Sequence, residues 1–203
     1  MTRRVAILLF PQVEVLDFAG PYEVFTTANR MAARAAPDAA PLFDVITVAR
    51  KAGLCRARAG LQAAVDHPLD AAPAPDVLIV PGGVVDDERR EAATLRWLER
   101  TAASAELVAS VCTGAFLLAD ACVLPAGLPV TTHWEDVADL RRDHPRLDVR
   151  EGLRWVDAGR FVTSAGISAG IDMSLHLVER LAGRALAERT ARQMDFAWTE
   201  NRD

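Results

Sequence analysis

Short apolar runs alternate along the chain with longer stretches of helical periodicity, and this alternation limits the possible folds more than any other feature. The clearest runs, at residues 5–10, 43–49, 77–80 and 107–111, are rich in valine, isoleucine and leucine. Strands that are apolar on both faces are typical of parallel sheets, whose strands are joined by helical crossovers. The pattern therefore predicts an α/β fold with a doubly wound, mostly parallel sheet and helices on both faces.

The remaining elements follow from periodicity and from glycine and proline. We expect a first helix near Gly20–Pro21 and a hairpin from Trp155 to Thr163 with its turn at Gly159. A short extra strand is expected at 61–65, and further helices at 86–103, 113–121, 169–182 and 185–199. No repeat, low-complexity tract or flexible linker interrupts the series. The prediction is one domain over residues 1–203.

Composition excludes several classes of protein. The 23 basic residues against 28 acidic ones give a net charge of −5, which leaves no electrostatic footprint for nucleic acid. No apolar run approaches the roughly 20 residues that cross a bilayer, and the basic N-terminus lacks the longer apolar segment of a secretory signal. The three cysteines and four histidines lack metal-ligand spacing. We expect a cytoplasmic protein without a metal or cofactor that binds neither nucleic acid nor membrane.

One cysteine stands at the junction of a buried strand and a helix. The run 107–111 leads directly into Cys112, and a helix is expected to open at Thr113. This is the layout of a nucleophile elbow, in which a tight turn presents one side chain to solvent. The helix N-terminus is expected to lower the pKa of the thiol, whose thiolate is the reactive form. Position alone leaves a buried structural cysteine equally favoured; Cys55 and Cys122 lack this context and are interpreted as structural.

Two loops are candidates for groups beside that thiol. After the strand at 77–80, the amides of Gly83 and Thr113 are expected at the carboxyl edge of the sheet, where they could form an oxyanion-type pocket. Taken alone, Pro-Gly-Gly is more often a plain turn. Asp17 follows the first strand, between apolar neighbours. It is either a helix-capping carboxylate or a buried acid with a raised pKa that exchanges protons beside the thiol.

Two later segments are supporting candidates. His133 lies at the end of an expected strand and could orient or polarise the cysteine, or be a structural histidine. The stretch from Ser164 to Asp172 forms a glycine-containing turn before a helix. It either lines the pocket or only caps that helix, and the residues leave both interpretations open.

These segments occur in one order: LDFAGP, VPGG, SVCTGAFLLA, TTHW and TSAGISAGID. The ordered set resembles the ThiJ/PfpI superfamily over nearly the whole chain, from Val5 to about Trp198. The resemblance implies a flavodoxin-like fold of the class I glutamine-amidotransferase type. Within the superfamily the sequence is most similar to the isonitrile hydratase branch, in which an aspartate follows the first strand and a threonine follows the nucleophilic cysteine. Asp17, Cys112 and Thr113 match these positions.

That branch adds water to an isonitrile and releases an N-substituted formamide through a cysteine thioimidate. The resemblance implies Cys112 as nucleophile, Asp17 as proton donor and acceptor, and Thr113 as an assisting group. It also implies a small-molecule substrate and a homodimer. Because isonitriles are poorly solvated, we expect an apolar pocket, whose wall residues by motif position are Phe18, Trp134, Ile167 and Ser168.

Two differences from other branches of the superfamily argue against a peptidase and against a glutamine amidotransferase. Thr113 stands where peptidase-like members carry a histidine, and His133 follows Cys112 too closely for the late His-x-Glu of glutamine amidotransferases. The sensor domains of AraC-type regulators look alike but continue into a DNA-binding module, whereas this acidic chain ends at Asp203. Two alternatives remain: another ThiJ/PfpI cysteine enzyme with glyoxalase-like or deglycase-like chemistry, and a redox-sensing protein in which Cys112 oxidises to a sulfinic acid.

Overall fold

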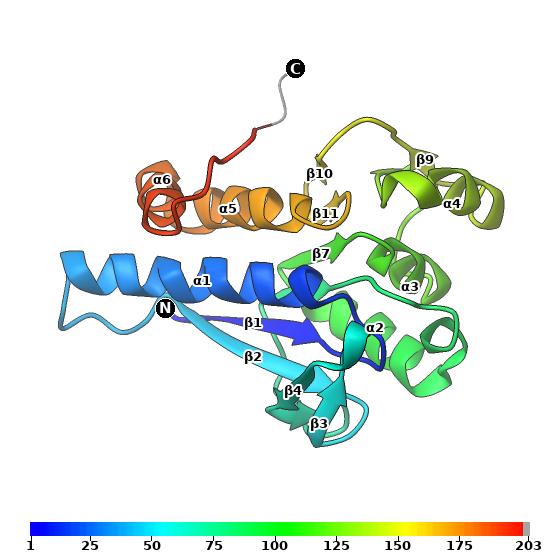
Figure 1. Ribbon diagram of the computed structural model, residues 1–203, viewed down its shortest axis with the longest axis horizontal. Helices are drawn as coiled ribbons and strands as arrows, with labels where there is room; N and C mark the ends of the chain where they lie inside the picture. Colours follow the sequence, from blue (N-terminus) through cyan, green and yellow to red (C-terminus); the bar gives the residue numbers. More distant parts are fainter. Residues whose placement is uncertain (201–203) are drawn as a thin grey trace.

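A seven-stranded sheet forms the centre of the structure, a computed structural model in which residues 1–200 are described (Figure 1). The strand order is β10–β11–β7–β6–β1–β2–β5, and all neighbours are parallel except β10 and β11. The doubly wound, mostly parallel sheet expected from the apolar runs is confirmed. The strands are β1 (Arg3–Leu8), β2 (Phe43–Ala49), β5 (His67–Pro68), β6 (Val77–Val80), β7 (Leu107–Val111), β10 (Trp155–Ala158) and β11 (Phe161–Ser164).

The two central strands β6 and β7 are completely buried, which explains why their sequences are apolar on both faces. Their register pairs Val77 with Leu107 and Val80 with Ser110. The carboxyl ends of β1, β6 and β7 therefore meet at one edge of the sheet. Open α/β sheets bind ligands at this edge, so the topology brings the loops after these three strands to a common site.

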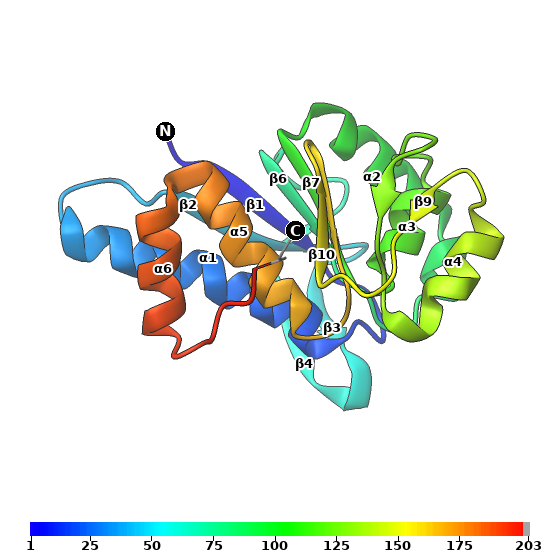
Figure 2. The ribbon, with the colours of Figure 1, turned by 90° about the horizontal axis from the view of Figure 1, so that it is seen from above.

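Helices cover both faces of the sheet (Figures 1 and 2). One layer contains α1 (Val15–Ala35), α5 (Ala169–Ala182) and α6 (Arg184–Gln193), which pack against one another. The opposite side carries α2 (Ala92–Ser104) and α3 (Gly114–Asp120), with α4 (Val137–Asp143) beside them. Within residues 1–200, no helix is both long enough and apolar enough to cross a membrane.

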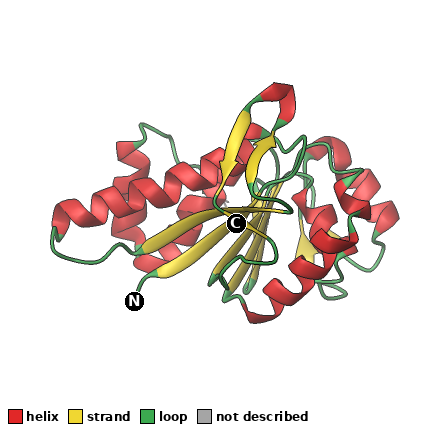
Figure 3. Cartoon of the chain, turned by 90° about the horizontal axis from the view of Figure 1, so that it is seen from below, coloured by secondary structure: helices red, strands yellow, loops and turns green. Residues whose placement is uncertain are grey.

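Small elements surround the central sheet. Strands β3 (Gly53–Arg56) and β4 (Gln62–Val65) form a hairpin that stands away from it, with the 3₁₀ turn η1 (Arg58–Gly60) at its tip (Figures 1 and 3). The short strands β8 (Pro129–Val130) and β9 (Asp148–Val149) pair with each other, and two further 3₁₀ turns are η2 (Glu88–Arg90) and η3 (Trp134–Asp136).

Three helix boundaries differ from the sequence-based expectation. Helix α1 begins at Val15 rather than near Gly20, and it contains Pro21, which cannot donate a hydrogen bond to the preceding turn. Proline is favoured at helix starts, and this preference misplaced the boundary. Helix α2 starts only at Ala92, because the acidic segment before it forms a loop and η2, and α6 already ends at Gln193. The early start of α1 places Asp17 inside the helix.

Candidate active site

Cys112 occupies a strained turn between β7 and α3. Its φ of 57° lies in the left-handed region that residues other than glycine rarely adopt. Two hydrogen bonds hold this backbone: the Cys112 N–H donates to the Ser164 carbonyl (3.1 Å), and the Thr132 hydroxyl donates to the Cys112 carbonyl (2.9 Å). A tight strand-to-helix turn with this conformation is the geometry of a nucleophile elbow.

Three glycines make room for the elbow. A Cβ atom added to Gly82 would lie 2.5 Å from the Thr113 nitrogen, and one added to Gly114 would collide with the Val80 carbonyl. A Cβ added to Gly166 would lie 2.7 Å from the Cys112 sulfur. The glycine turn before α5, which the sequence left as either a pocket wall or a helix cap, therefore packs directly against the thiol.

The Cys112 sulfur faces a cavity, although the residue as a whole is only 7% exposed. Burial raises the pKa of the thiol far above its usual range, and the neighbouring Asp17 carboxylate adds to this effect. The backbone amide and hydroxyl of Thr113 oppose the rise without reversing it. The backbone at the helix N-terminus does lower the pKa of the thiol, as expected, but desolvation is the larger effect, so the net shift is upward. A raised pKa favours the protonated form of the thiol, so a reaction at this sulfur would need a group that accepts its proton.

Asp17 is the carboxyl group whose charge raises the pKa of the Cys112 thiol most. It lies in the first turn of α1 and is completely buried. The Gly82 N–H donates to its Oδ2 atom (3.1 Å), whereas its Oδ1 atom has no hydrogen-bond partner within residues 1–200. The helix-capping interpretation does not hold, since the side chain of Glu14 caps α1 by accepting a hydrogen bond from the Val15 N–H.

Burial raises the pKa of Asp17 from its ordinary 3.8 to about 7. The hydrogen bond from Gly82 opposes this rise, the charge of Glu14 adds to it, and interaction with the Cys112 thiol lowers the pKa again to a smaller extent. A carboxyl group with a pKa near neutrality both accepts and releases protons readily at physiological pH. Asp17 and Cys112 influence each other's pKa, which shows that the two groups are electrostatic neighbours.

The loop after β6 contributes differently from the expectation. The Gly83 N–H donates to the Thr113 hydroxyl (2.9 Å), and that hydroxyl in turn donates to the Gly83 carbonyl (2.9 Å). The Gly83 amide is therefore already used and is not free for an oxyanion-type role. The Thr113 amide instead interacts with the Cys112 sulfur, where it stabilises the thiolate.

His133 lies on the other side of the Gly166 turn. A Cβ at Gly166 would lie 2.7 Å from both the His133 Nδ1 atom and the Cys112 sulfur, so the imidazole and the thiol flank the same glycine. The His133 Nε2 atom is 3.4 Å from Glu135, while its buried Nδ1 atom has no hydrogen-bond partner in the described part of the chain. His133 and Cys112 both line the cavity, so a role of the imidazole in orienting or polarising the thiol stays a prediction.

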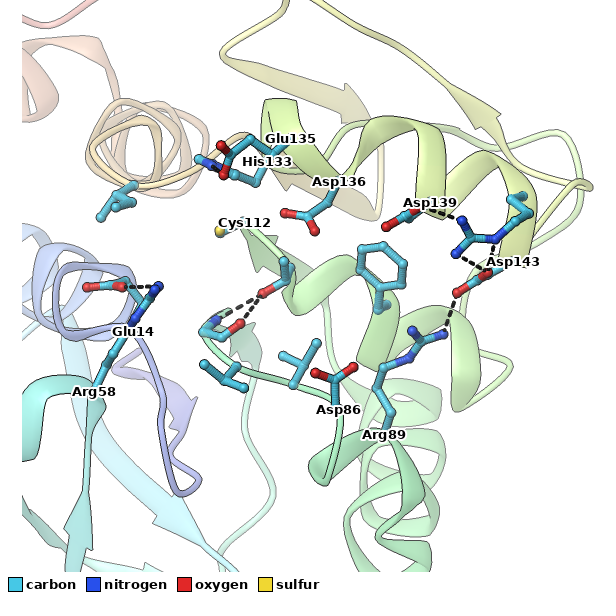
Figure 4. A pocket seen from close by; sticks show the side chains of 17 residues that line it. Glu14, Arg58, Asp86, Arg89, Cys112, His133, Glu135, Asp136, Asp139 and Asp143 are labelled. Atoms are coloured by element: carbon cyan, nitrogen blue, oxygen red, sulfur yellow. Dashed lines mark hydrogen bonds and ion pairs between the residues drawn. The ribbon is translucent and has the colours of Figure 1, made fainter.

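The cavity above the thiol has a volume of about 370 Å³ (Figure 4). Of the four wall residues named from the motifs, Ile167 lines it, whereas Phe18 is buried in the core, Trp134 is 71% exposed and Ser168 contacts Arg154. The expected apolar pocket is also wrong, because charged side chains dominate the wall. The lining carboxylates are Glu14, Asp86, Glu135, Asp136, Asp139 and Asp143.

Sequence reasoning missed this acidic wall because its members come from separate loops. The signal was present as the acidic clusters at 86–88 and 135–139, but nothing in the sequence indicates that the two clusters face the same cavity. Within residues 1–200, no group of three or more histidine, cysteine, aspartate or glutamate side chains is arranged to hold a metal ion.

The sheet, the strained cysteine and the glycines around it define the class of this protein. The DJ-1/PfpI family model matches residues 3–180, and the chain belongs to this family, as the ordered motifs predicted. Among solved structures, the ThiJ/PfpI family protein from Pseudomonas syringae superimposes with a TM-score of 0.84 at 24% identity, covering 100% of this chain and 78% of that one. Drosophila melanogaster DJ-1beta superimposes with a TM-score of 0.81 at 19% identity, covering 98% and 100%. These likenesses show the shared fold.

Two curated relatives are similar in sequence. An isonitrile hydratase from Pseudomonas putida is 34% identical over 202 residues, which cover 97% of this chain and 80% of that protein. The HTH-type transcriptional regulator GbdR from Pseudomonas aeruginosa is 32% identical over 183 residues, which cover 90% of this chain and 48% of the regulator. The chain thus spans about half the length of that regulator, and relatives of comparable similarity include both an enzyme and transcription regulators.

Proposed function

We propose that the protein is an isonitrile hydratase, which converts R–N≡C and water into the formamide R–NH–CHO. The observation that carries the proposal is the pairing of Cys112 with a buried carboxyl group whose Oδ1 atom is free. The similarity to the Pseudomonas putida isonitrile hydratase supports the same reaction. The cavity offers space of the size that small-molecule sites usually have.

In the first step the Cys112 sulfur attacks the terminal isonitrile carbon. A C–S bond forms, and the carbon takes up a proton to give the thioimidate R–N=CH–S–Cys112. The thiol loses one proton and the carbon gains one, so a single group that accepts and then releases a proton completes the step. Asp17 performs this transfer in the proposal, because the protonated resting thiol needs a base and the pKa of Asp17 is about 7.

In the second step water adds to the thioimidate carbon. The nitrogen gains one proton and water loses one, which gives R–NH–CH(OH)–S–Cys112. The C–S bond then breaks, the hydroxyl proton leaves, and the products are the formamide and the free thiol. Asp17 again carries the protons in both directions, and covalent catalysis divides the hydration into two easier steps.

Two neighbours assist this sequence. The Thr113 amide stabilises negative charge on the sulfur when the thiol proton leaves, and the Thr113 hydroxyl, bound to both the amide and the carbonyl of Gly83, holds this turn in place. His133, which shares the Gly166 turn with the thiol, orients the bound isonitrile.

The test is product analysis with n-butyl isocyanide. We expect the wild-type protein to form N-butylformamide, detected by proton NMR, and the Cys112→Ala variant to lose at least about a thousandfold in kcat/KM. Cys122→Ala is the matched control, since Cys122 is also a free cysteine but is exposed and away from the cavity. Turnover by the Cys112→Ala variant at the wild-type rate would contradict the proposed function.

A covalent intermediate gives a second readout. Addition of the thiol to the isonitrile increases the intact mass by the full mass of the isonitrile, because nothing leaves in that step. We expect this adduct on Cys112 when hydrolysis is slowed, and none in the Cys112→Ala variant. An oxidised Cys112 as the only modification would instead favour a redox-sensing thiol.

The same proposal places the enzyme in the cytoplasm as a one-domain homodimer that does not bind nucleic acid. The net charge of −5 supports the last of these expectations. Light scattering coupled to size-exclusion chromatography measures the oligomeric state, with a mass twice the monomer's 22.0 kDa as the expected result.

A further inference from the structure

The wall of the cavity above Cys112 carries an excess of negative charge. Six carboxylates line it, against the three guanidinium groups of Arg58, Arg89 and Arg142 (Figure 4). An isonitrile is neutral at its reacting end, so the hydration chemistry itself does not require this wall. The negative charge of the wall therefore acts on the part of the bound molecule that extends away from the isonitrile group.

The three arginines are already held by carboxylates. Each forms at least one ion pair, and Arg89 and Arg142 each form more than one. The pairs are Arg58–Glu14 (3.1 Å), Arg89–Asp120 (2.6 Å), Arg89–Asp143 (3.1 Å), Arg142–Asp139 (2.5 Å) and Arg142–Asp143 (3.0 Å). The cavity therefore presents no unpaired cation to an anionic ligand.

Two lining carboxylates remain without such partners. Asp86, in the loop after β6, and Asp136, in η3, form neither an ion pair nor a side-chain hydrogen bond within residues 1–200. Burial raises the pKa of Asp136; His133 opposes the rise, and Asp139, Glu135 and Asp86 add to it. Figure 4 shows Asp136 between Cys112 and Asp139, with Asp86 on the opposite side of the cavity. The two carboxylates repel each other across a space that a cation would fill.

A second observation, independent of the wall, also points to a ligand in this space. The cavity reaches the sulfur of Cys112, and His133, which lines the same cavity, keeps a buried Nδ1 atom without a hydrogen-bond partner among the residues described. A molecule that reacts at Cys112 extends outward past Asp136, whose charge also acts on the thiol. The apolar side chains of Phe116 and Ile167 also line the cavity, in contact range of a hydrocarbon portion.

We propose that the isonitrile bound here carries a positively charged group, which Asp136 and Asp86 hold while its terminal carbon meets Cys112. The inference rests on the proposed function and names the substrate class of that site. A cation placed between two unpaired carboxylates relieves their repulsion, whereas an anion in the same place is repelled by the wall. The charge thus selects cationic over neutral and anionic isonitriles.

The first experiment compares two isonitriles of the same shape. The cationic probe is 2-(trimethylammonio)ethyl isocyanide, and the neutral probe is 3,3-dimethylbutyl isocyanide, in which carbon replaces the charged nitrogen. We expect kcat/KM for the cationic probe to be about ten- to a hundredfold higher, mainly through a lower KM. The preference is expected to shrink as the salt concentration rises.

Variants assign the preference to the two carboxylates. Asp136→Asn and Asp86→Asn are each expected to reduce the preference for the cationic probe several-fold, and the double variant to remove most of it. Asp38→Asn is the matched control, since Asp38 is an exposed aspartate in the loop before β2, away from the cavity. Its preference is expected to equal that of the wild type.

The second experiment does not depend on isonitrile hydration. Methanethiosulfonates CH₃SO₂–S–R react with a thiolate to form the disulfide Cys–S–S–R and release methanesulfinate. We expect 2-(trimethylammonio)ethyl methanethiosulfonate to label Cys112 about ten- to a hundredfold faster than the 2-sulfonatoethyl reagent, as measured by mass spectrometry of the Cys112 peptide. The exposed Cys122 in the same sample shows the intrinsic reactivity of the two reagents.

The two experiments separate the possible failures. If both isonitriles are hydrated equally and both reagents label Cys112 equally, the charge inference is overturned while the hydratase function stands. If neither isonitrile is hydrated but the cationic reagent is preferred in an Asp136-dependent way, the hydratase function fails and the site is still selective for cations. A preference for the cationic probe that survives in the double variant also overturns the assignment to Asp86 and Asp136.

Discussion

Asp17 and Asp172 are both completely buried aspartates in the first turn of a helix on the same side of the sheet. At Asp172 both oxygen atoms are used: Arg154 binds Oδ2 (2.6 Å from Nε), and the Thr199 N–H donates to Oδ1 (2.7 Å). At Asp17 only Oδ2 has a partner, and Oδ1 is left free beside Cys112. The same residue type at the same helical position therefore has two different environments.

This difference indicates that Asp172 has a structural role and that Asp17 is available for proton transfer. Burial raises the pKa of both side chains, but at Asp172 the Thr199 amide and Arg154 oppose the rise. At Asp17 no cation opposes it, and the pKa reaches about 7. A buried acid without a counterion costs stability in its charged form, and such groups cluster at functional sites. Asp172 ties the segment after α6 to the start of α5, whereas Asp17 is free to exchange a proton.

The largest effect that separates the two aspartates is on turnover. Replacing Asp17 with asparagine keeps an acceptor for the Gly82 N–H but removes the proton-transfer group, so we expect kcat/KM for isonitrile hydration to fall by about 10²- to 10⁴-fold. The matched Asp172→Asn variant is expected to stay within about fivefold of the wild type. Formamide formation followed by NMR measures both. Equal losses in the two variants would show that the comparison does not reflect catalysis.

The second effect is the pH dependence of the reaction. Asp17 must be deprotonated to accept the thiol proton, and its pKa is about 7. We expect kcat/KM to fall by about tenfold per pH unit as the pH decreases below that value. A rate that stays level down to pH 5 would mean that a carboxyl group with an ordinary pKa, or none, performs the transfer.

Some features of the fold and of the candidate site could be predicted from the sequence, and others could not. Local patterns were sufficient for the buried strands and for the turn at Cys112, whereas the family resemblance selected Asp17 as the acid, and that role stays a prediction. They were not sufficient for the start of α1, because Pro21 indicates a helix start in isolation while tertiary packing tolerates it inside the helix. The direction of the Cys112 pKa shift was also mispredicted, since a helix N-terminus is visible in a sequence and the depth of burial is not.

Long-range placement explains the other differences. The contact of Gly166 with the Cys112 sulfur joins residues that are 54 positions apart, and the acidic wall combines loops around Asp86 and Asp136. No local pattern encodes such contacts. The Gly83 amide was a reasonable oxyanion candidate by position, but the hydroxyl of Thr113 occupies it.

The third effect is on stability, and the two aspartates differ in its sign. Between pH 3.8 and about 7, folded Asp17 retains a proton that the unfolded chain has lost, so this group makes the fold less stable as the pH rises through that window. We therefore expect Asp17→Asn to increase the free energy of unfolding at pH 8 by about 1–3 kcal/mol, and to change it little at pH 4. Urea unfolding at the two pH values measures this difference.

Asp172→Ala is the opposite case. It leaves Arg154 without its carboxylate and the Thr199 N–H without an acceptor, so we expect a loss of about 2–4 kcal/mol at pH 8. Urea unfolding also measures this loss. A stabilising Asp172→Ala variant or a strongly destabilised Asp17→Asn variant would reverse the assignment of the two roles.

The smallest effect concerns the charge beside Asp17. Glu14 raises the pKa of Asp17 through its negative charge, so Glu14→Gln is expected to move the midpoint of the pH–rate profile downward by less than about one pH unit. The comparison variant is Asp38→Asn, an exposed aspartate far from the site, which is expected to leave the midpoint unchanged. An upward shift in Glu14→Gln would contradict the electrostatic explanation.

The central claim is that a buried carboxyl group with a near-neutral pKa directly faces the thiol of Cys112. Titration of carbon-13-labelled aspartate by NMR, with the Asp17 signal assigned by its loss in Asp17→Asn, tests this most directly. The account predicts a midpoint near pH 7, which rises further in Cys112→Ala because the thiol lowers the pKa of Asp17. A midpoint near 4 that does not respond to the removal of the thiol would contradict it.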